Sequence, residues 1–119
     1  MKKKKTAIML SPAEERNFFE QAMETEMKNY LSERTVYVGT ERWIINNASE
    51  DVLKELFKQQ PLSNDNEELL VIKRSEKILQ NYILKYPLSP KAEKLMVDSG
   101  KEDAVFLYER TYGKIKEGA

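Results

Sequence analysis

The sequence predicts an all-α protein, a right-handed α-solenoid in which helical hairpins stack on one another. Three observations favour this fold class. The chain aligns with itself after a shift of 26 residues, so that residues 51–76 lie over residues 77–102. Apolar residues inside each unit recur at the spacing of one helical turn. Serines and prolines stand where the helices of such a unit would begin and end.

The repeat extends over most of the 119 residues. The alignment has no gap, and the same step reaches back to residues 25–50 and forward to Asp103. Identical pairs in the two best units include Leu53–Leu79, Pro61–Pro87, Leu62–Leu88, Ser63–Ser89 and Glu67–Glu93. Repeats of about 20 to 50 residues indicate units that bury their apolar faces only by stacking.

The repeat also sets the domain organisation. A chain of this length is one domain's worth. We expect a single α-solenoid domain over residues 10–112, with repeats at about 25–50, 51–76 and 77–102 and a partial unit at each end. Residues 1–9 are expected to form a disordered basic arm, and residues 113–119 a short tail.

Each unit is predicted to be two short helices joined by a turn. Pro61 and Pro87 stop the first helix, Ser63 and Ser89 cap the second, and Gly100 is the expected C-terminal cap of the later unit. The first helix carries an apolar stripe at Val52, Leu53, Leu56 and Phe57. The predicted helices span residues 12–32, 41–47, 51–59, 64–73, 76–86, 90–98 and 102–112.

The start of the repeat region departs from this pattern. Ser11 and Glu14 form a capping box that opens a helix, and neither glycine nor proline follows Pro12 before residue 39. Residues 12–32 are therefore predicted to be one long helix. Residues 35–39 lean towards β structure, so an irregular loop is expected there, with Thr40 capping a shortened helix.

The hairpin pattern resembles α-solenoid repeats of the HEAT and tetratricopeptide (TPR) kind, with a shorter unit. The segment Tyr86–Leu95, YPLSPKAEKL, is similar to tandem repeats of uncharacterised bacterial helical-repeat proteins. The resemblance covers residues 51–112 best, and it implies a fold. It brings no catalytic residue, cofactor or ligand.

The amino-acid composition argues against a catalytic or metal-binding site. The chain has no cysteine and no histidine, which removes thiol nucleophiles, most zinc sites and the commonest general base near neutral pH. Carboxylate pairs such as Glu67/Glu68 are common on solvated helices. We therefore expect no enzyme, and no catalytic, cofactor-binding or metal-binding residue. The absence of cysteine favours a reducing, cytoplasmic compartment.

The basic arm is the main charged feature. The 20 basic and 20 acidic residues cancel, so no global field attracts nucleic acid or membrane. Lys2, Lys3, Lys4 and Lys5 could contact phosphates, or they could be a solubilising tail. The apolar stretch behind them ends at Ser11, too short for a signal peptide or a membrane span.

Equivalent positions in successive units form columns through the stack. The column Glu15, Glu41, Glu67 and Glu93 is acidic throughout. It could be a ladder for a basic partner, but a carboxylate in the first turn of a helix is better explained by contacts inside the stack. Trp43 shares a column with Leu69 and Leu95, which favours a core position over a ligand platform.

Four residues are the candidates for an interaction surface: Tyr86, Phe106, Leu107 and Tyr112. Tyr86 and Tyr112 belong to a column that changes chemistry from unit to unit, although packing against the next hairpin explains them equally well. Phe106 and Leu107 replace polar residues of the inner units, and exposed apolar area usually marks a contact site. Residues 103–112 are therefore expected to bind a second copy or a partner, unless Ile115 folds back or the long first helix covers them.

The function that follows is non-enzymatic. We expect a helical-repeat protein that binds an unknown protein or peptide. The alternative is a nucleic-acid-associated accessory or regulatory protein that uses Lys2–Lys5.

Overall fold

A computed structural model describes residues 10–115 of the chain, and within them it holds eight helices and no strand. The basic arm with Lys2–Lys5 lies outside the described residues, as do residues 116–119. The helices are α1 (Pro12–Gln21), α2 (Glu24–Glu33), α3 (Val38–Asn47), α4 (Glu50–Gln59), α5 (Asn64–Lys73), α6 (Glu76–Ile83), α7 (Pro90–Asp98) and α8 (Glu102–Tyr112). The predicted all-α class is confirmed.

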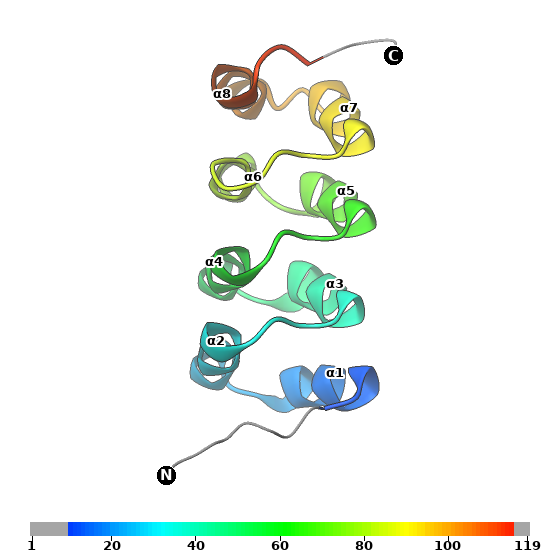
Figure 1. Cartoon of the computed structure of the whole chain (residues 1–119), viewed down its shortest axis with the longest axis vertical. Helices are drawn as coiled ribbons and strands as arrows, with labels where there is room; N and C mark the ends of the chain where they lie inside the picture. Colours follow the sequence, from blue (N-terminus) through cyan, green and yellow to red (C-terminus); the bar gives the residue numbers. More distant parts are fainter. Residues whose placement is uncertain (1–9, 116–119) are drawn as a thin grey trace.

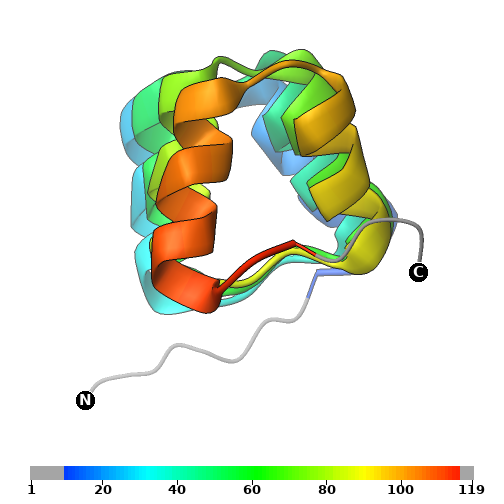
Figure 2. The same ribbon diagram turned by 90° about the horizontal axis from the view of Figure 1, so that it is seen from above.

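The helices form two layers. Each helix contacts the helix two places further along the chain, so α1, α3, α5 and α7 make one layer and α2, α4, α6 and α8 make the other. We call them the odd layer and the even layer. The stack measures 52 × 25 × 24 Å, and seen from its end the successive helices of each layer nearly superimpose (Figures 1 and 2). These contacts are consistent with a helical repeat.

Within the part of the chain that is described, no helix is long and apolar enough to span a membrane.

Serine caps begin most of the helices, as predicted. The side chains of Ser49, Ser63 and Ser75 each accept a hydrogen bond at 3.3 Å from the backbone N–H three residues further on. Ser89 does the same at 3.4 Å, and Ser11 completes a capping box with Glu14. These bonds satisfy N–H groups that have no partner inside a helix.

The long helix predicted over residues 12–32 is wrong. Ala22 and Met23 have extended backbones, with ψ of 151° and 159°, and they separate α1 from α2. The break lets α2 cross to the even layer, and the backbone N–H of Met23 donates to the Glu26 carboxylate at 2.8 Å. Both residues tolerate a helix, so packing decides the break.

The loop predicted at residues 35–39 is also wrong in part. Helix α3 begins at Val38, and Thr40 is buried inside it, with no hydrogen-bond partner for its hydroxyl among the described residues. Tyr37 occupies the N-cap position without a capping side chain. Its backbone N–H donates instead to the Glu15 carboxylate at 2.9 Å. At the other end of the chain, α6 stops at Ile83, three residues before the predicted end.

The core runs between the layers along the stack. The predicted apolar stripe of Val52, Leu53, Leu56 and Phe57 is buried, and the core continues through Leu70, Leu79, Tyr82 and Met96. Equivalent positions in the first and last described units carry carboxylates. Glu26 is exposed in the column of Val52 and Ile78, and Glu109 is half-buried in the column of Phe57 and Ile83. The stacking faces of these units are therefore more polar than those of the inner units.

Candidate interaction surface

The acidic column is part of the framework. Glu15, Glu41 and Glu67 are buried, and one oxygen of each carboxylate accepts a backbone N–H from the turn between the two helices of the next unit. The donors are Tyr37 at 2.9 Å, Ser63 at 3.2 Å and Ser89 at 2.8 Å. Each carboxylate thus ties one hairpin to the next, which supports the structural interpretation over a ladder for a basic partner.

Tyrosine hydroxyls donate to three of the four carboxylates in this column. The hydroxyls of Tyr30, Tyr82 and Tyr108 donate at 2.6 Å to Glu15, Glu67 and Glu93. The hydroxyl of Tyr82 also accepts the backbone N–H of Leu62 at 3.0 Å, and that of Tyr108 accepts Leu88 at 2.9 Å. We call each such tyrosine–glutamate pair a bracket.

Burial makes these tyrosines hard to ionise. It raises the pKa of Tyr30 to about 12, and the hydrogen bond to Glu15 adds to the rise. Burial raises the pKa of Tyr82 and Tyr108 further, with the bonded carboxylate as the next cause. Both effects oppose a second negative charge beside the glutamate.

One unit lacks the tyrosine. Leu56 stands in its place, and the side-chain amide of Gln60 donates to Glu41 at 2.5 Å and accepts the backbone N–H of Val36 at 2.7 Å. Asn66 donates to Glu41 as well, at 2.8 Å. Gln60 therefore makes the donor and acceptor contacts that the hydroxyl of Tyr82 makes one unit later.

Tyr86 and Tyr112 contact the preceding even-layer helix. The hydroxyl of Tyr86 donates to the carbonyl of Phe57 at 2.5 Å, and that of Tyr112 donates to the carbonyl of Ile83 at 2.8 Å. Tyr86 is half-buried, while Tyr112 keeps 39% exposure. Their hydroxyls satisfy carbonyls at the ends of α4 and α6, so packing accounts for much of this column.

Phe106 and Leu107 differ in exposure. Phe106 is 64% exposed, and the Arg110 guanidinium lies 5.7 Å from its ring centroid. Leu107 is half-buried against the core, and so is Ile115. Helix α1 lies at the opposite end of the stack and cannot cover them (Figure 1). Trp43 is half-buried, with its ring 6.2 Å from that of Phe19, in keeping with a core position.

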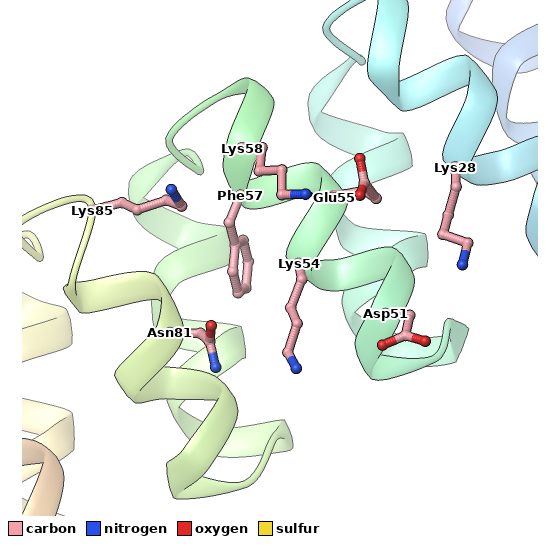
Figure 3. A pocket seen from close by; sticks show the side chains of 8 residues that line it. All are labelled: Lys28, Asp51, Lys54, Glu55, Phe57, Lys58, Asn81 and Lys85. Atoms are coloured by element: carbon pink, nitrogen blue, oxygen red, sulfur yellow. Dashed lines mark hydrogen bonds and ion pairs between the residues drawn. The ribbon is translucent and has the colours of Figure 1, made fainter.

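Exposed charged and apolar side chains lie together on the side of the even layer that faces away from the core. We call it the outer face, and define it by the columns of Asp51, Lys54, Glu55 and Lys58 in α4. Phe106 falls in the column of Lys54, and Leu84, 61% exposed, in that of Lys58. A shallow groove of about 420 Å³ crosses the outer face from α2 to α6 (Figure 3). It is lined by Lys28, Asp51, Lys54, Glu55, Phe57, Lys58, Asn81 and Lys85.

The sequence analysis missed these lysines. Lys28 and Lys54 stand one repeat apart at positions that point away from the apolar stripe. That spacing was a usable signal, because equivalent positions in neighbouring units lie side by side in a stack.

The structure places the four predicted residues on different parts of the molecule. Phe106 and Leu107 both fall in columns of the outer face, but Phe106 is exposed and Leu107 is half-buried. Tyr86 and Tyr112 bond to backbone near the ends of α4 and α6. The described residues contain no cluster of three or more side chains suited to a metal ion. Comparison with known proteins matched the chain to no family model, no curated protein and no solved structure.

Proposed function

We propose that this chain is a non-enzymatic helical-repeat protein that binds another protein or peptide through its outer face. In fold terms it is a right-handed α-solenoid of short HEAT- or TPR-like hairpins, working in the cytoplasm. The observation that carries the proposal is the outer face itself, which holds both a lysine-lined groove and the exposed apolar residues Leu84 and Phe106.

The contrast between buried and exposed columns supports this role. The column of Glu15, Glu41, Glu67 and Glu93 has the same residue type in every unit. The outer-face column changes from Lys28 and Lys54 to Gln80 and Phe106. Buried columns are constrained by packing, whereas the outer face is free to vary with a partner. Exposed aromatic and apolar side chains beside charged ones are typical of protein contact sites.

The glutamates support a non-enzymatic role. Glu15, Glu41 and Glu67 each accept at least two hydrogen bonds from groups of this chain, and they are buried. Their carboxylates serve the fold, although Glu15 also lines a small cavity of about 180 Å³ beside Tyr30 and Arg34. A second copy is one partner to consider, because Phe106 lies on α8 within residues 103–112.

Site-specific photo-cross-linking tests the proposal. A photoreactive residue at Gln80 or Phe106 samples the outer face, and the same residue at Asp65 or Lys91, which are exposed in α5 and α7, is the matched control. We expect cross-linked products in cell extract from Gln80 and Phe106, and few from the controls. Products only from the controls would reject the outer face.

Two further experiments separate the alternatives. Sedimentation of wild type beside Phe106→Glu/Leu107→Glu tests self-association, since a dimer through residues 103–112 must dissociate in the variant. A salt titration with generic DNA tests the role of Lys2–Lys5. Phosphate contacts weaken steeply with salt, and absence of binding at low salt would reject the nucleic-acid alternative.

A further inference from the structure

We propose that the groove across α2, α4 and α6 binds an acidic peptide segment in extended form. This inference rests on the proposed function and names the chemistry of its partner. Figure 3 shows the lysines around α4, with Lys28 reaching from α2 and Lys85 from the end of α6. The Phe57 ring lies between the two later helices and forms part of the floor.

The groove lining is positively charged, whereas the described part of the chain as a whole is negatively charged. Its lining holds four lysines and two carboxylates. The whole chain has 20 basic and 20 acidic residues, but without Lys2–Lys5, Lys116 and Glu117 the described part holds 15 and 19, a net charge of −4. An acidic segment is thus attracted to the groove and repelled by its surroundings.

The lysines are available to a ligand. Lys54 and Lys85 form no ion pair within residues 10–115. Lys58 pairs with Glu55 at 3.1 Å and Lys28 with Glu24 at 3.8 Å, each inside one helix, and both lysine side chains are exposed. Exposed pairs of this kind contribute little, so an incoming carboxylate can replace them at small cost.

The length of the groove fits a short extended segment. Packed helices lie about 8–10 Å apart, so α2 and α6 are separated by about 16–20 Å. An extended chain rises about 3.3 Å per residue, and about six residues cover that span. A carboxylate on alternate residues would face the lysines, since successive side chains point to opposite sides.

The carboxylates in the lining favour a peptide over nucleic acid. Asp51 and Glu55 stand among the lysines, and they would repel a chain that carries a phosphate at every step. A peptide can place a neutral or basic residue beside them. Asn81, on the α6 side of the groove, adds a neutral polar group to the lining.

Fluorescence polarisation with a labelled six-residue peptide that alternates glutamate and serine tests the proposal, using the full chain. In the matched probe, glutamine replaces each glutamate. Lys54→Glu/Lys85→Glu reverses two groove charges, and Lys73→Glu/Lys91→Glu makes the same charge change on the exposed odd layer. Lys85→Glu alone changes a single exposed residue, so it still tests the groove if the double variant misfolds. A variant with Lys2–Lys5 replaced by serine removes the basic arm.

We expect wild type to bind the glutamate peptide and not the glutamine peptide, with affinity that falls as salt rises. The groove variants should weaken binding at least about tenfold, and the odd-layer and arm variants less than about threefold. No binding at low salt, or equal loss in groove and odd-layer variants, would overturn the proposal. So would a single-stranded oligonucleotide of equal charge that binds the groove as tightly as the peptide. If binding fails while Gln80 and Phe106 still cross-link a partner, the acidic peptide is rejected and the proposed function stands.

Discussion

The side-chain amide of Gln60 lies 2.5 Å from a carboxylate oxygen of Glu41, in the place that the hydroxyl of Tyr82 takes beside Glu67. A leucine at position 56 and a glutamine at position 60 together replace the two tyrosines found at 82 and 86. A buried carboxylate without a donor is costly, so each unit must provide one, and this chain does so in two ways.

Replacing the leucine and glutamine at positions 56 and 60 by the two tyrosines of the next unit tests this equivalence. Gln60→Tyr alone removes one of the two side-chain amides that donate to Glu41, and Leu56→Tyr alone crowds Gln60. Leu56→Tyr/Gln60→Tyr copies the arrangement of the next unit, in which the rings of Tyr82 and Tyr86 lie 5.2 Å apart. We expect the double variant to be more stable than the sum of the single effects by about 0.5–3 kcal/mol, measured by denaturant unfolding. Additive effects would show that the two positions do not share the bracket.

The brackets should stabilise the fold where their carboxylates are buried. Glu67→Gln keeps the size of the side chain but turns one acceptor into a donor that faces Tyr82 or Ser89. We expect it to lower the free energy of unfolding by about 1–3 kcal/mol. Glu68→Gln, one residue along α5 and only half-buried, is the control and should change stability by less than about 0.5 kcal/mol. Equal losses would mean that the bracket is not specific.

Ionisation of the bracket tyrosines should unfold the protein at high pH. The pKa of Tyr30 is raised to about 12 in the folded chain, and those of Tyr82 and Tyr108 are raised further. The unfolded chain loses these protons near pH 10 while the folded chain keeps them, so stability is full below about pH 10 and falls above it.

Chemical denaturation between about pH 8 and pH 12 measures this fall. Tyr82→Phe should be less stable at neutral pH, because Glu67 loses one of its two donors, but it should show a shallower loss above about pH 10. A variant with the same slope as wild type would contradict the assignment to Tyr82. Tyr37→Phe is the control, since the Tyr37 side chain is 36% exposed and its hydroxyl donates to the carbonyl of Leu10 and not to a carboxylate.

The inward face of the even layer is tested by Leu79→Ala. Leu79 is fully buried in α6, and removal of a filled core side chain should cost about 2–5 kcal/mol. The exposed Leu84, just after α6, is the matched control, and Leu84→Ala should cost less than about 0.5 kcal/mol. Similar losses at the two positions would mean that the wrong face had been assigned to the core.

Local signals predicted most of the fold. Two kinds of signal were local: the apolar columns, and the serine caps at Ser49, Ser63, Ser75 and Ser89. Each depends on residues a few positions apart, so it can be recognised within one unit and found again in the next. The break at Ala22–Met23 had no such signal, because neither residue disfavours a helix. The start of α3 depends on Glu15, which is 22 residues from Tyr37 in sequence and adjacent only in the folded stack.

The candidate site was less accessible to sequence reasoning. Tyr86 and Tyr112 stand in a variable column, yet their hydroxyls bind carbonyls of the preceding helix, a contact that spans 29 residues. Phe106 was placed correctly outside the apolar stripe. The groove combines side chains from α2, α4 and α6, so its charge appears only when the units are set side by side.

The central claim is that the brackets hold the units together while the outer face recognises the partner. Amide hydrogen exchange, measured with and without a captured partner, tests this claim most directly. We predict that partner binding slows exchange in α4 and α6, where helices line the groove, and leaves α5 and α7 unchanged. Slowed exchange concentrated in α3, α5 and α7 would contradict this account, because it would place the partner on the odd layer.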